Sequence, residues 1–202
     1  GQISLNENTE RLTIRFPQGA PSGRAVLRLN FTGTLNDQLR GFYRSQYTDP
    51  SGNHRYLATT QFEATDARRA LPCWDEPSLK AEFDVTLVVP EGLTAISNMP
   101  VASEKPVSSE RKAVHFETTP KMSTYLLVFV VGDLACVEDT TPSGIQVRVW
   151  ATRGKEQLGQ FALENSIRAL DFMNDYFGID YPLPKMDHIA VPDFAAGAME
   201  NW

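Results

Sequence analysis

The sequence lacks the short motifs that usually mark a catalytic centre. Its three histidines, His54, His115 and His188, lie far apart, so no two of them stand at helical spacing and no HExxH motif is present. A GxSxG nucleophile elbow, a phosphate-binding P-loop and a GxGxxG fingerprint are missing as well. The 202 residues therefore show neither a complete catalytic centre nor a metal site.

Cysteines are equally scarce, with Cys73 and Cys136 the only two. Two cysteines that do not form a CxxC pair are too few for a disulfide framework and are typical of reduced thiols in a cytosolic protein. The longest apolar run, Tyr125–Val131, has the length of a strand and is too short to span a bilayer. Gly1–Ser4 has neither the basic start nor the apolar stretch of a signal peptide. These features together predict a cytoplasmic protein.

Positive charge is in deficit, with 19 lysines and arginines against 25 acidic residues and a formal net charge of −6. An acidic surface repels the phosphate backbone of nucleic acids and the headgroups of anionic lipids. We therefore expect neither nucleic acid nor a membrane among the partners. The composition is otherwise ordinary, at 42% hydrophobic residues, and the chain is long enough to bury a substantial core.

Alternating apolar and polar residues run through the first two thirds of the chain and predict β-strands. Turns rich in glycine and proline, such as Pro17–Gly23 and Asp49–Asn53, separate the early strands. Short strands with turns between them indicate an antiparallel sandwich or saddle. The expected strand Tyr125–Val131 should be central in its sheet, because it is apolar on both faces. The expected strands are Leu12–Phe16, Leu27–Phe31, Gly41–Tyr47, Arg55–Thr60, Phe83–Val89 and Tyr125–Val131.

The pattern changes after about Asp139. Gln157–Phe177 predicts a helix whose polar residues occupy one narrow stripe, so most of its surface should be buried. Gly178 should end this helix. Strands expected at Ile145–Ala151 and Asp187–Phe194 flank it, and the order strand–helix–strand is typical of the start of an α/β domain.

The expected fold class is therefore mainly β, with two domains. An N-terminal β-saddle or sandwich domain should occupy residues 1–140, and the beginning of an α/β domain should occupy residues 141–202. The sequence stops at Gly197–Trp202, where a strand pattern runs into an apolar tryptophan without a polar tail. This ending favours a second domain that is truncated.

Two stretches are hard to explain by the fold alone. Thr60–Pro77 reads TQFEATDARRALPCWDEP, and Gly197–Trp202 reads GAMENW. Both resemble zinc aminopeptidases of the M1 family, whose signature includes GxMEN, and two long matches in the right order very rarely arise by chance. Shorter stretches at Gly41–Ser45, Met122–Leu126 and Tyr181–Lys185 resemble the puromycin-sensitive and fungal cytosolic branch of that family.

The resemblance implies release of N-terminal amino acids from peptides by zinc-activated water, in a thermolysin-like catalytic domain. It also implies that HExxH, a further glutamate ligand and a catalytic tyrosine follow downstream. We therefore expect no catalytic residue and no metal ligand among the residues of this chain, and we expect zinc in the full-length protein. The expected partners are peptides with a free N-terminus and the rest of the catalytic domain.

An amine clamp is the first site that the resemblance implies. Glu63 and Glu200, from different domains, would grip the α-ammonium group of the substrate. An ammonium group offers three donors, and two carboxylates neutralise and orient it. Without the resemblance, Glu63 would be interpreted as an ordinary strand carboxylate. Arg68 and Asp75 are interpreted as structural, closing a tight corner by an internal ion pair.

A substrate-pairing strand is the second implied site. Gly197 and Ala198 would let the substrate backbone approach closely, because a bulky side chain there would push the peptide away. Met199 would form a pliable wall of the pocket for the first side chain. Asn201 belongs to the same strand, and Gln61 matches a neighbouring polar contact of the family. A non-catalytic peptide-binding or interaction module, with the same β-saddle but no turnover, is the alternative that stays open.

Overall fold

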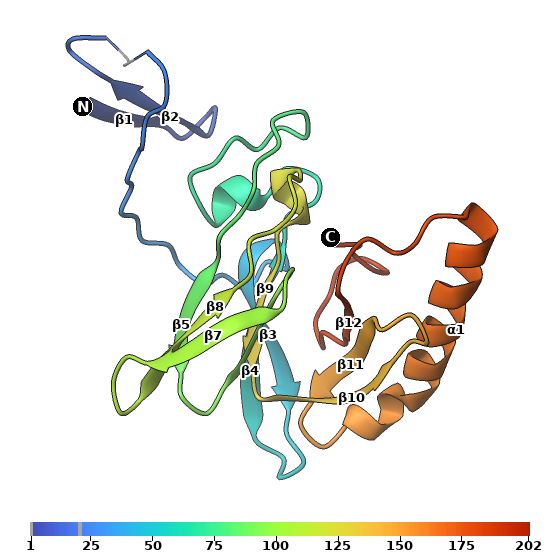
Figure 1. Ribbon diagram of the computed structural model, residues 1–202. Coiled ribbons are helices and arrows are strands. Elements are labelled where there is room, and N and C mark those ends of the chain that lie inside the picture. Colours follow the sequence, from blue (N-terminus) through green and yellow to red (C-terminus); the bar gives the residue numbers. More distant parts are fainter. Residues whose placement is uncertain (1, 20–21) are drawn as a thin grey trace.

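The computed structural model describes residues 2–19 and 22–202, and these residues form four β-sheets and one α-helix (Figure 1). A hairpin at the N-terminus consists of β1 (Gln2–Asn6) and β2 (Arg11–Arg15). The largest sheet has the order β3-β4-β9-β6, from β3 (Gly41–Thr48), β4 (His54–Gln61), β9 (Phe129–Gly132) and β6 (Thr94–Ser97). A second sheet has the order β5-β8-β7, from β5 (Thr86–Pro90), β8 (Arg111–Phe116) and β7 (Val101–Pro106). The last sheet has the order β10-β11-β12, from β10 (Leu134–Thr140), β11 (Gln146–Thr152) and β12 (Lys185–Ile189).

The four-stranded sheet is covered on both faces, which confirms the expected mainly β, sandwich-like architecture. Strand β3 alternates strictly between inward and outward side chains, as its sequence predicts. One face packs with the sheet β5-β8-β7 in a core that contains Phe62, Phe116 and Met122. The opposite face contributes Leu57 and Val130 to a core shared with residues of β11 and β12.

The sheet β10-β11-β12 and the helix α1 (Gln160–Phe177) pack together as two layers, one of strands and one of helix. Strands β11 and β12 are parallel, so the chain crosses over between them, and α1 lies in that crossover. Val147 and Val149 of β11 pack against Leu163 and Leu170 of α1. Figure 1 shows α1 on the side of this sheet that faces away from the four-stranded sheet.

The helix ends where the sequence predicts, but it is far less buried than expected. Gly178 adopts a left-handed conformation with φ 63° and caps α1 through a hydrogen bond to the carbonyl of Asn174. Only one stripe of α1 faces the sheet, and Phe161 and Tyr176 are 78% and 71% exposed. The prediction of a largely buried helix is therefore wrong within this chain, because the sheet covers a single face of the helix.

Four expected strands differ in the structure, and one of them, Phe83–Val89, is a strand only from Thr86 on. Leu27–Phe31 belongs to none of the sheets that residues 2–19 and 22–202 form, and none of their strand pairings includes it. The central strand is shortened to β9, since the 3-10 turn Thr124–Leu126 occupies the first part of the apolar run. Asp187–Phe194 is a strand only as far as Ile189. Side-chain alternation predicts extended backbone, whereas a strand also needs a partner.

The corner after β4 is closed as the sequence predicts. Arg68 donates a hydrogen bond from Nε to Asp75 at 2.9 Å, and the backbone N–H of Arg68 donates to the same carboxylate at 3.1 Å. Glu10 in the turn of the β1–β2 hairpin forms ion pairs with Arg68 and Arg69 at 3.4 and 3.5 Å. These contacts tie the N-terminal hairpin, which stands apart from the sheets in Figure 1, to the corner.

The expected division between residues 140 and 141 stays a prediction. Strand β10 ends at this point, and it pairs with β11 from Leu134↔Thr152 to Thr140↔Gln146, so the hairpin spans the division. Across residues 2–19 and 22–202, no helix combines the length and the apolar character that crossing a bilayer requires.

A buried ion network joins the two sheets. Asp187 of β12 accepts hydrogen bonds from Arg148 Nε and Nη2 at 2.6 and 2.8 Å, and from Trp150 Nε1 at 3.0 Å. Lys185 Nζ lies 2.5 Å from Asp187 Oδ2 and also donates to the carbonyl of Ser97 in β6 at 2.9 Å. The side chains of Lys185 and Asp187 are buried, so this network links the ends of β12 and β6 away from water.

Asp187 is held in its ionised form. Burial by itself would raise its pKa, but hydrogen bonds from Arg148 and the charge of Lys185 outweigh burial and hold the pKa below its ordinary value of 3.8. A lowered pKa in the folded state stabilises the fold above the unfolded-state pKa. That stabilisation is lost as the pH falls through the lower pKa of the folded state.

We expect Asp187→Asn to lower the free energy of unfolding by about 3 kcal/mol, because it leaves the ammonium of Lys185 buried without a counter-charge. Urea unfolding at neutral pH measures this loss. The wild-type chain should also lose stability below about pH 4 through protonation of Asp187, and the variant should lack that part of the pH dependence.

Asp133→Asn is the matched control. Asp133 pairs with Arg153 at 2.7 Å, but both side chains are largely exposed. Loss of an exposed pair costs at most about 1 kcal/mol. Equal losses for the two variants would contradict a special role for the buried network.

Candidate functional site

A cavity of about 930 Å³ lies between the four-stranded sheet and the end of the chain. Strands β4, β6, β9 and β12 contribute side chains to it, and residues 196–202 form the opposite wall. In Figure 1 the C-terminus lies beside the upper end of β9, in the space between that sheet and α1. The cavity is therefore enclosed by residues from both parts of the fold.

The segment 197–201 contains five of the seven residues expected to bind substrate, and all five line this cavity. The segment has no regular secondary structure and is largely exposed. A Cβ atom built at Gly197 would meet no atom within 4 Å, so packing within this chain does not require glycine there. This open space leaves the backbone accessible from the cavity.

The side-chain amides of Asn98, which is buried, and Asn201, which is half-buried, fix the end of this segment. Asn201 Nδ2 donates to the carbonyl of Leu126 at 3.1 Å, and Asn98 Nδ2 donates to the same carbonyl at 2.8 Å. Asn98 Nδ2 also donates to the carbonyl of Trp202, and Asn98 Oδ1 accepts from the backbone N–H of Val128 at 3.0 Å. Asn98 was not among the expected site residues, because its partners lie far away in the sequence and no local pattern marks it.

Glu200 is the exposed acidic group of the cavity wall. The other charged residues of the wall, Lys185 and Asp187, are paired with each other, and Asp187 is also paired with Arg148. His188 is held by Ser166, with Nε2 and Oγ 2.8 Å apart. Among the residues that the structure describes, Glu200 forms no ion pair and no side-chain hydrogen bond. Glu200 is therefore the exposed carboxylate of the cavity wall without an ionic partner among the described residues, and such a carboxylate suits a cationic group.

Glu63 and Gln61 lie outside the cavity lining. Glu63 is exposed in the turn that follows β4 and forms no ion pair within residues 2–19 and 22–202. Gln61 ends β4, and the pairing Thr59↔Val130, continued by two residues, places it opposite Val128. The buried Oε1 atom of Gln61 has no hydrogen-bond partner in the part of the chain that the structure describes. The structure thus brings Gln61 to the same end of the sheet as the buried amides, but it does not join Glu63 to Glu200.

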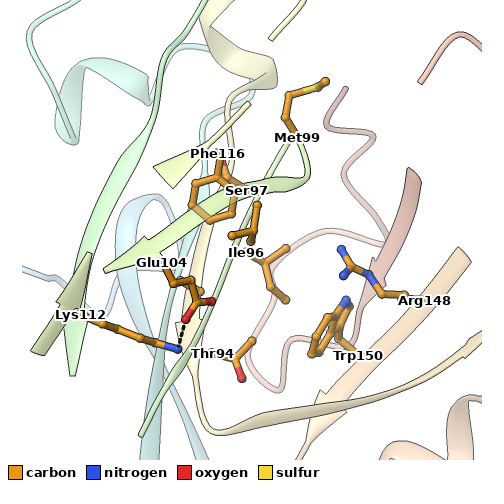
Figure 2. Close-up of a pocket in the computed structure, with 11 residues that line it drawn as sticks. Thr94, Ile96, Ser97, Met99, Glu104, Lys112, Phe116, Arg148 and Trp150 are labelled. Atoms are coloured by element: carbon orange, nitrogen blue, oxygen red, sulfur yellow. Dashed lines mark hydrogen bonds and ion pairs between the residues drawn. The ribbon is translucent and has the colours of Figure 1, made fainter. Parts of the chain in front are cut away.

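A smaller pocket of about 220 Å³ lies beside β6, between side chains of β7 and β8 and side chains of β11 (Figure 2). Lys112 and Glu104 face each other there at 2.9 Å. Arg148 lies over the ring of Trp150, 5.1 Å from its centroid, and is paired with Asp187. Because its charges are already compensated, this pocket offers a ligand less than the larger cavity does.

The described residues do not fit a zinc ion. Across residues 2–19 and 22–202, no three His, Cys, Asp or Glu side chains gather as a metal site. His54 and His115 contact Gln46 and Thr86, each at 3.0 Å, in different sheets. Burial, followed by the charge of Asp75, raises the pKa of the Cys73 thiol to about 11, so this residue is a poor nucleophile.

We expect Asn98→Ala to loosen residues 198–202 and to lower the free energy of unfolding by about 1–3 kcal/mol, because a buried N–H and buried carbonyls lose their partner. Hydrogen exchange followed by mass spectrometry should show faster exchange in this segment. The control Asn165→Ala removes an exposed side chain whose bond, to the carbonyl of Phe161, lies within α1. Unchanged exchange in Asn98→Ala would contradict the anchoring role.

Comparison with known proteins matches both parts of the chain. Residues 2–126 match the peptidase M1 N-terminal domain, and residues 161–202 match the peptidase family M1 domain.

Curated relatives align along the whole chain. Aminopeptidase M1-C of Oryza sativa subsp. japonica is 52% identical over 201 residues, which cover 100% of this chain and 23% of the relative. Puromycin-sensitive aminopeptidase of Caenorhabditis elegans is 50% identical over 202 residues, covering 100% of this chain and 21% of the relative. Alanine/arginine aminopeptidase of Saccharomyces cerevisiae is 53% identical over 207 residues, with 100% and 24% covered.

The chain thus spans between a fifth and a quarter of the length of these relatives. The match to the M1 N-terminal domain alone covers residues 2–126, more than half of the chain, and the cavity-lining segment 197–201 lies inside the second match. On this evidence the chain belongs to peptidase family M1.

Proposed function

We propose that this chain forms part of the substrate site of an aminopeptidase that releases N-terminal residues from peptides. The observation that carries the proposal is Glu200, an uncompensated carboxylate on the wall of a cavity whose other charges are paired. A peptide with a free N-terminus presents an ammonium group, which such a carboxylate attracts. The relatives that are named aminopeptidases support this choice of substrate class.

In the proposed clamp, Glu200 and Glu63 bind the same ammonium group from different sides. An ammonium group carries three N–H donors, so one carboxylate leaves donors free for a second. The exposed turn that carries Glu63 leaves its carboxylate available. Each charge-assisted hydrogen bond contributes roughly 1.5–3 kcal/mol. A clamp that fixes the amine sets the distance to the scissile bond and restricts cleavage to the first residue.

The proposed role of the segment 197–201 is to pair with the substrate backbone. Gly197 leaves open space at its Cα, and Ala198 is small, so an extended peptide can approach closely. Met199 supplies a flexible apolar wall for the first side chain. Asn201 holds the end of the segment through Leu126. The proposed role of Gln61 is a neighbouring polar contact at the first pocket, although its Oε1 atom is buried in this chain.

The catalytic chemistry in this proposal belongs to other parts of a longer protein. Zinc, the general base and the catalytic tyrosine come from outside the chain, and residues 141–202 join them as part of a catalytic domain, after a β-saddle domain at residues 1–140. The proposed location of that protein is the cytoplasm. A non-catalytic peptide-binding module is the second candidate, and it is favoured by the missing metal cluster among the described residues.

We expect the 202-residue chain to bind no stoichiometric zinc, because its histidines are held in separate places. Metal analysis after dialysis against zinc tests this directly. One tightly bound zinc per chain, together with turnover of an aminoacyl reporter, would refute the proposal that zinc and the catalytic residues come from outside this chain.

We expect Glu200→Gln and Glu63→Gln, made in the full-length protein, each to lower kcat/KM at least about tenfold. Glutamine keeps the size and hydrogen-bonding ability of glutamate but removes the charge that faces the ammonium group. The double variant should lose less than the sum of the single losses, because the first change already misplaces the amine. The measurement compares free peptides with N-acetylated peptides, which lack the cation.

Glu91→Gln is the matched control, since Glu91 is an exposed glutamate in a turn away from the cavity. Its kcat/KM should stay within about twofold of wild type, as for most surface changes. If Glu63→Gln behaved like Glu91→Gln, Glu63 would be an ordinary surface carboxylate and the clamp would depend on Glu200 alone. Cleavage of acetylated peptides as fast as free ones by the wild-type enzyme would refute the aminopeptidase proposal.

A further inference from the structure

Two buried hydroxyl groups lie on the edge strand β3. Tyr43 and Ser45 are both 0% exposed, although β3 is the outermost strand of its sheet. They are opposite Thr59 and Leu57 in the register of β3 and β4, so they share the face of the sheet on which Thr59 lines the large cavity. Buried hydroxyls on such a face need hydrogen-bond partners.

Asp193 satisfies both hydroxyls. Tyr43 Oη donates to the carbonyl of Asp193 at 2.9 Å, and the backbone N–H of Asp193 donates to Ser45 Oγ at 2.8 Å. Asp193 Oδ2 in turn accepts from the backbone N–H of Gln46 at 2.8 Å. Asp193, in the second part of the fold, thus forms three hydrogen bonds to strand β3 of the first part, about 150 residues away in sequence.

Asp193 lies four residues before the segment that the proposed function assigns to the substrate. In the described part of the chain, no backbone–backbone hydrogen bond joins residues 194–202 to a strand. The segment is instead suspended between Asp193 at its start and the amides of Asn98 and Asn201 at its end. Its backbone is free to pair with a peptide, while its position is set by these two attachments.

We propose that Tyr43 and Ser45, acting through Asp193, are positioning residues for the substrate-pairing segment Gly197–Glu200. This inference rests on the proposed function in that it assigns a substrate to that segment. Release of either hydroxyl bond lets the start of the segment shift relative to the sheet. Glu200 and the pairing backbone then move away from the geometry that holds the amine, and small misplacements of this kind strongly reduce rates.

The experiment uses Tyr43→Phe, Ser45→Ala and the double variant in the full-length protein. Each change removes one hydroxyl and keeps the shape of the side chain closely. Tyr47→Phe is the matched control, because Tyr47 points to the same face of β3, is 9% exposed, and its hydroxyl has no hydrogen bond among the described residues. Two quantities are measured: kcat/KM for free and N-acetylated peptides, and hydrogen exchange of residues 194–202.

We expect Tyr43→Phe and Ser45→Ala each to lower kcat/KM for free peptides about tenfold, because the amine is no longer held in alignment. The ratio of kcat/KM for free peptides to kcat/KM for N-acetylated peptides should fall as well. Hydrogen exchange of residues 194–202 should become faster, with the sheet itself unchanged. Tyr47→Phe should match wild type in both measurements. The double variant should lose less kcat/KM than the two single losses combined, because both hydroxyls act through Asp193.

The outcomes separate this inference from the proposed function. If wild type prefers free peptides but both variants match Tyr47→Phe in rate and exchange, the positioning role is wrong and the aminopeptidase function stands. If wild type shows no such preference, the proposed function fails. Faster exchange confined to residues 194–202 would then still support the attachment, and unchanged exchange would overturn it.

Discussion

The four-stranded sheet β3-β4-β9-β6 must be covered on both faces, and the rest of the structure depends on this constraint. Its strands carry apolar side chains on each side, and an uncovered face would expose a large apolar patch to water. The sheet β5-β8-β7 covers one face. Strands β11 and β12, with the segment that follows, cover the other, so the cavity lies where this second cover is incomplete.

The second cover is held by polar groups whose partners lie across the interface. Lys185 reaches Ser97, Asn98 reaches Trp202, and Asp193 reaches β3. Buried polar groups of this kind specify one arrangement, because any shift leaves several of them without partners. Glu200, which is exposed on the cavity wall and forms no ion pair within the described residues, is therefore the charged group of the lining that is available to a ligand.

Much of the fold follows from local pattern, and the exceptions have one cause. Side-chain alternation predicted β3 and β4, and Gly178 predicted the end of α1, because both signals act over a few residues. The unpaired stretch Leu27–Phe31 and the exposed side of α1 were missed, since both depend on which element lies beside them. A pattern records what a segment can bury, and the neighbour decides how much of it is buried.

The same distinction applies to the site. Residues 197–201, which the motif marks as expected substrate contacts, line the cavity, whereas Gln61 and Glu63 do not. Tyr43 and Ser45 lie in a stretch that resembles the family, but no local pattern there or around Asn98 indicates which groups these side chains bond to. Their importance appears only when residues about 100 to 150 positions away are seen to complete their hydrogen bonds. A carboxylate clamp with one member on each part of the fold is sensitive to the angle between the parts. The side chains that fix that angle should therefore be as restrictive for recognition as the carboxylates themselves, because a charge in the wrong place orients nothing.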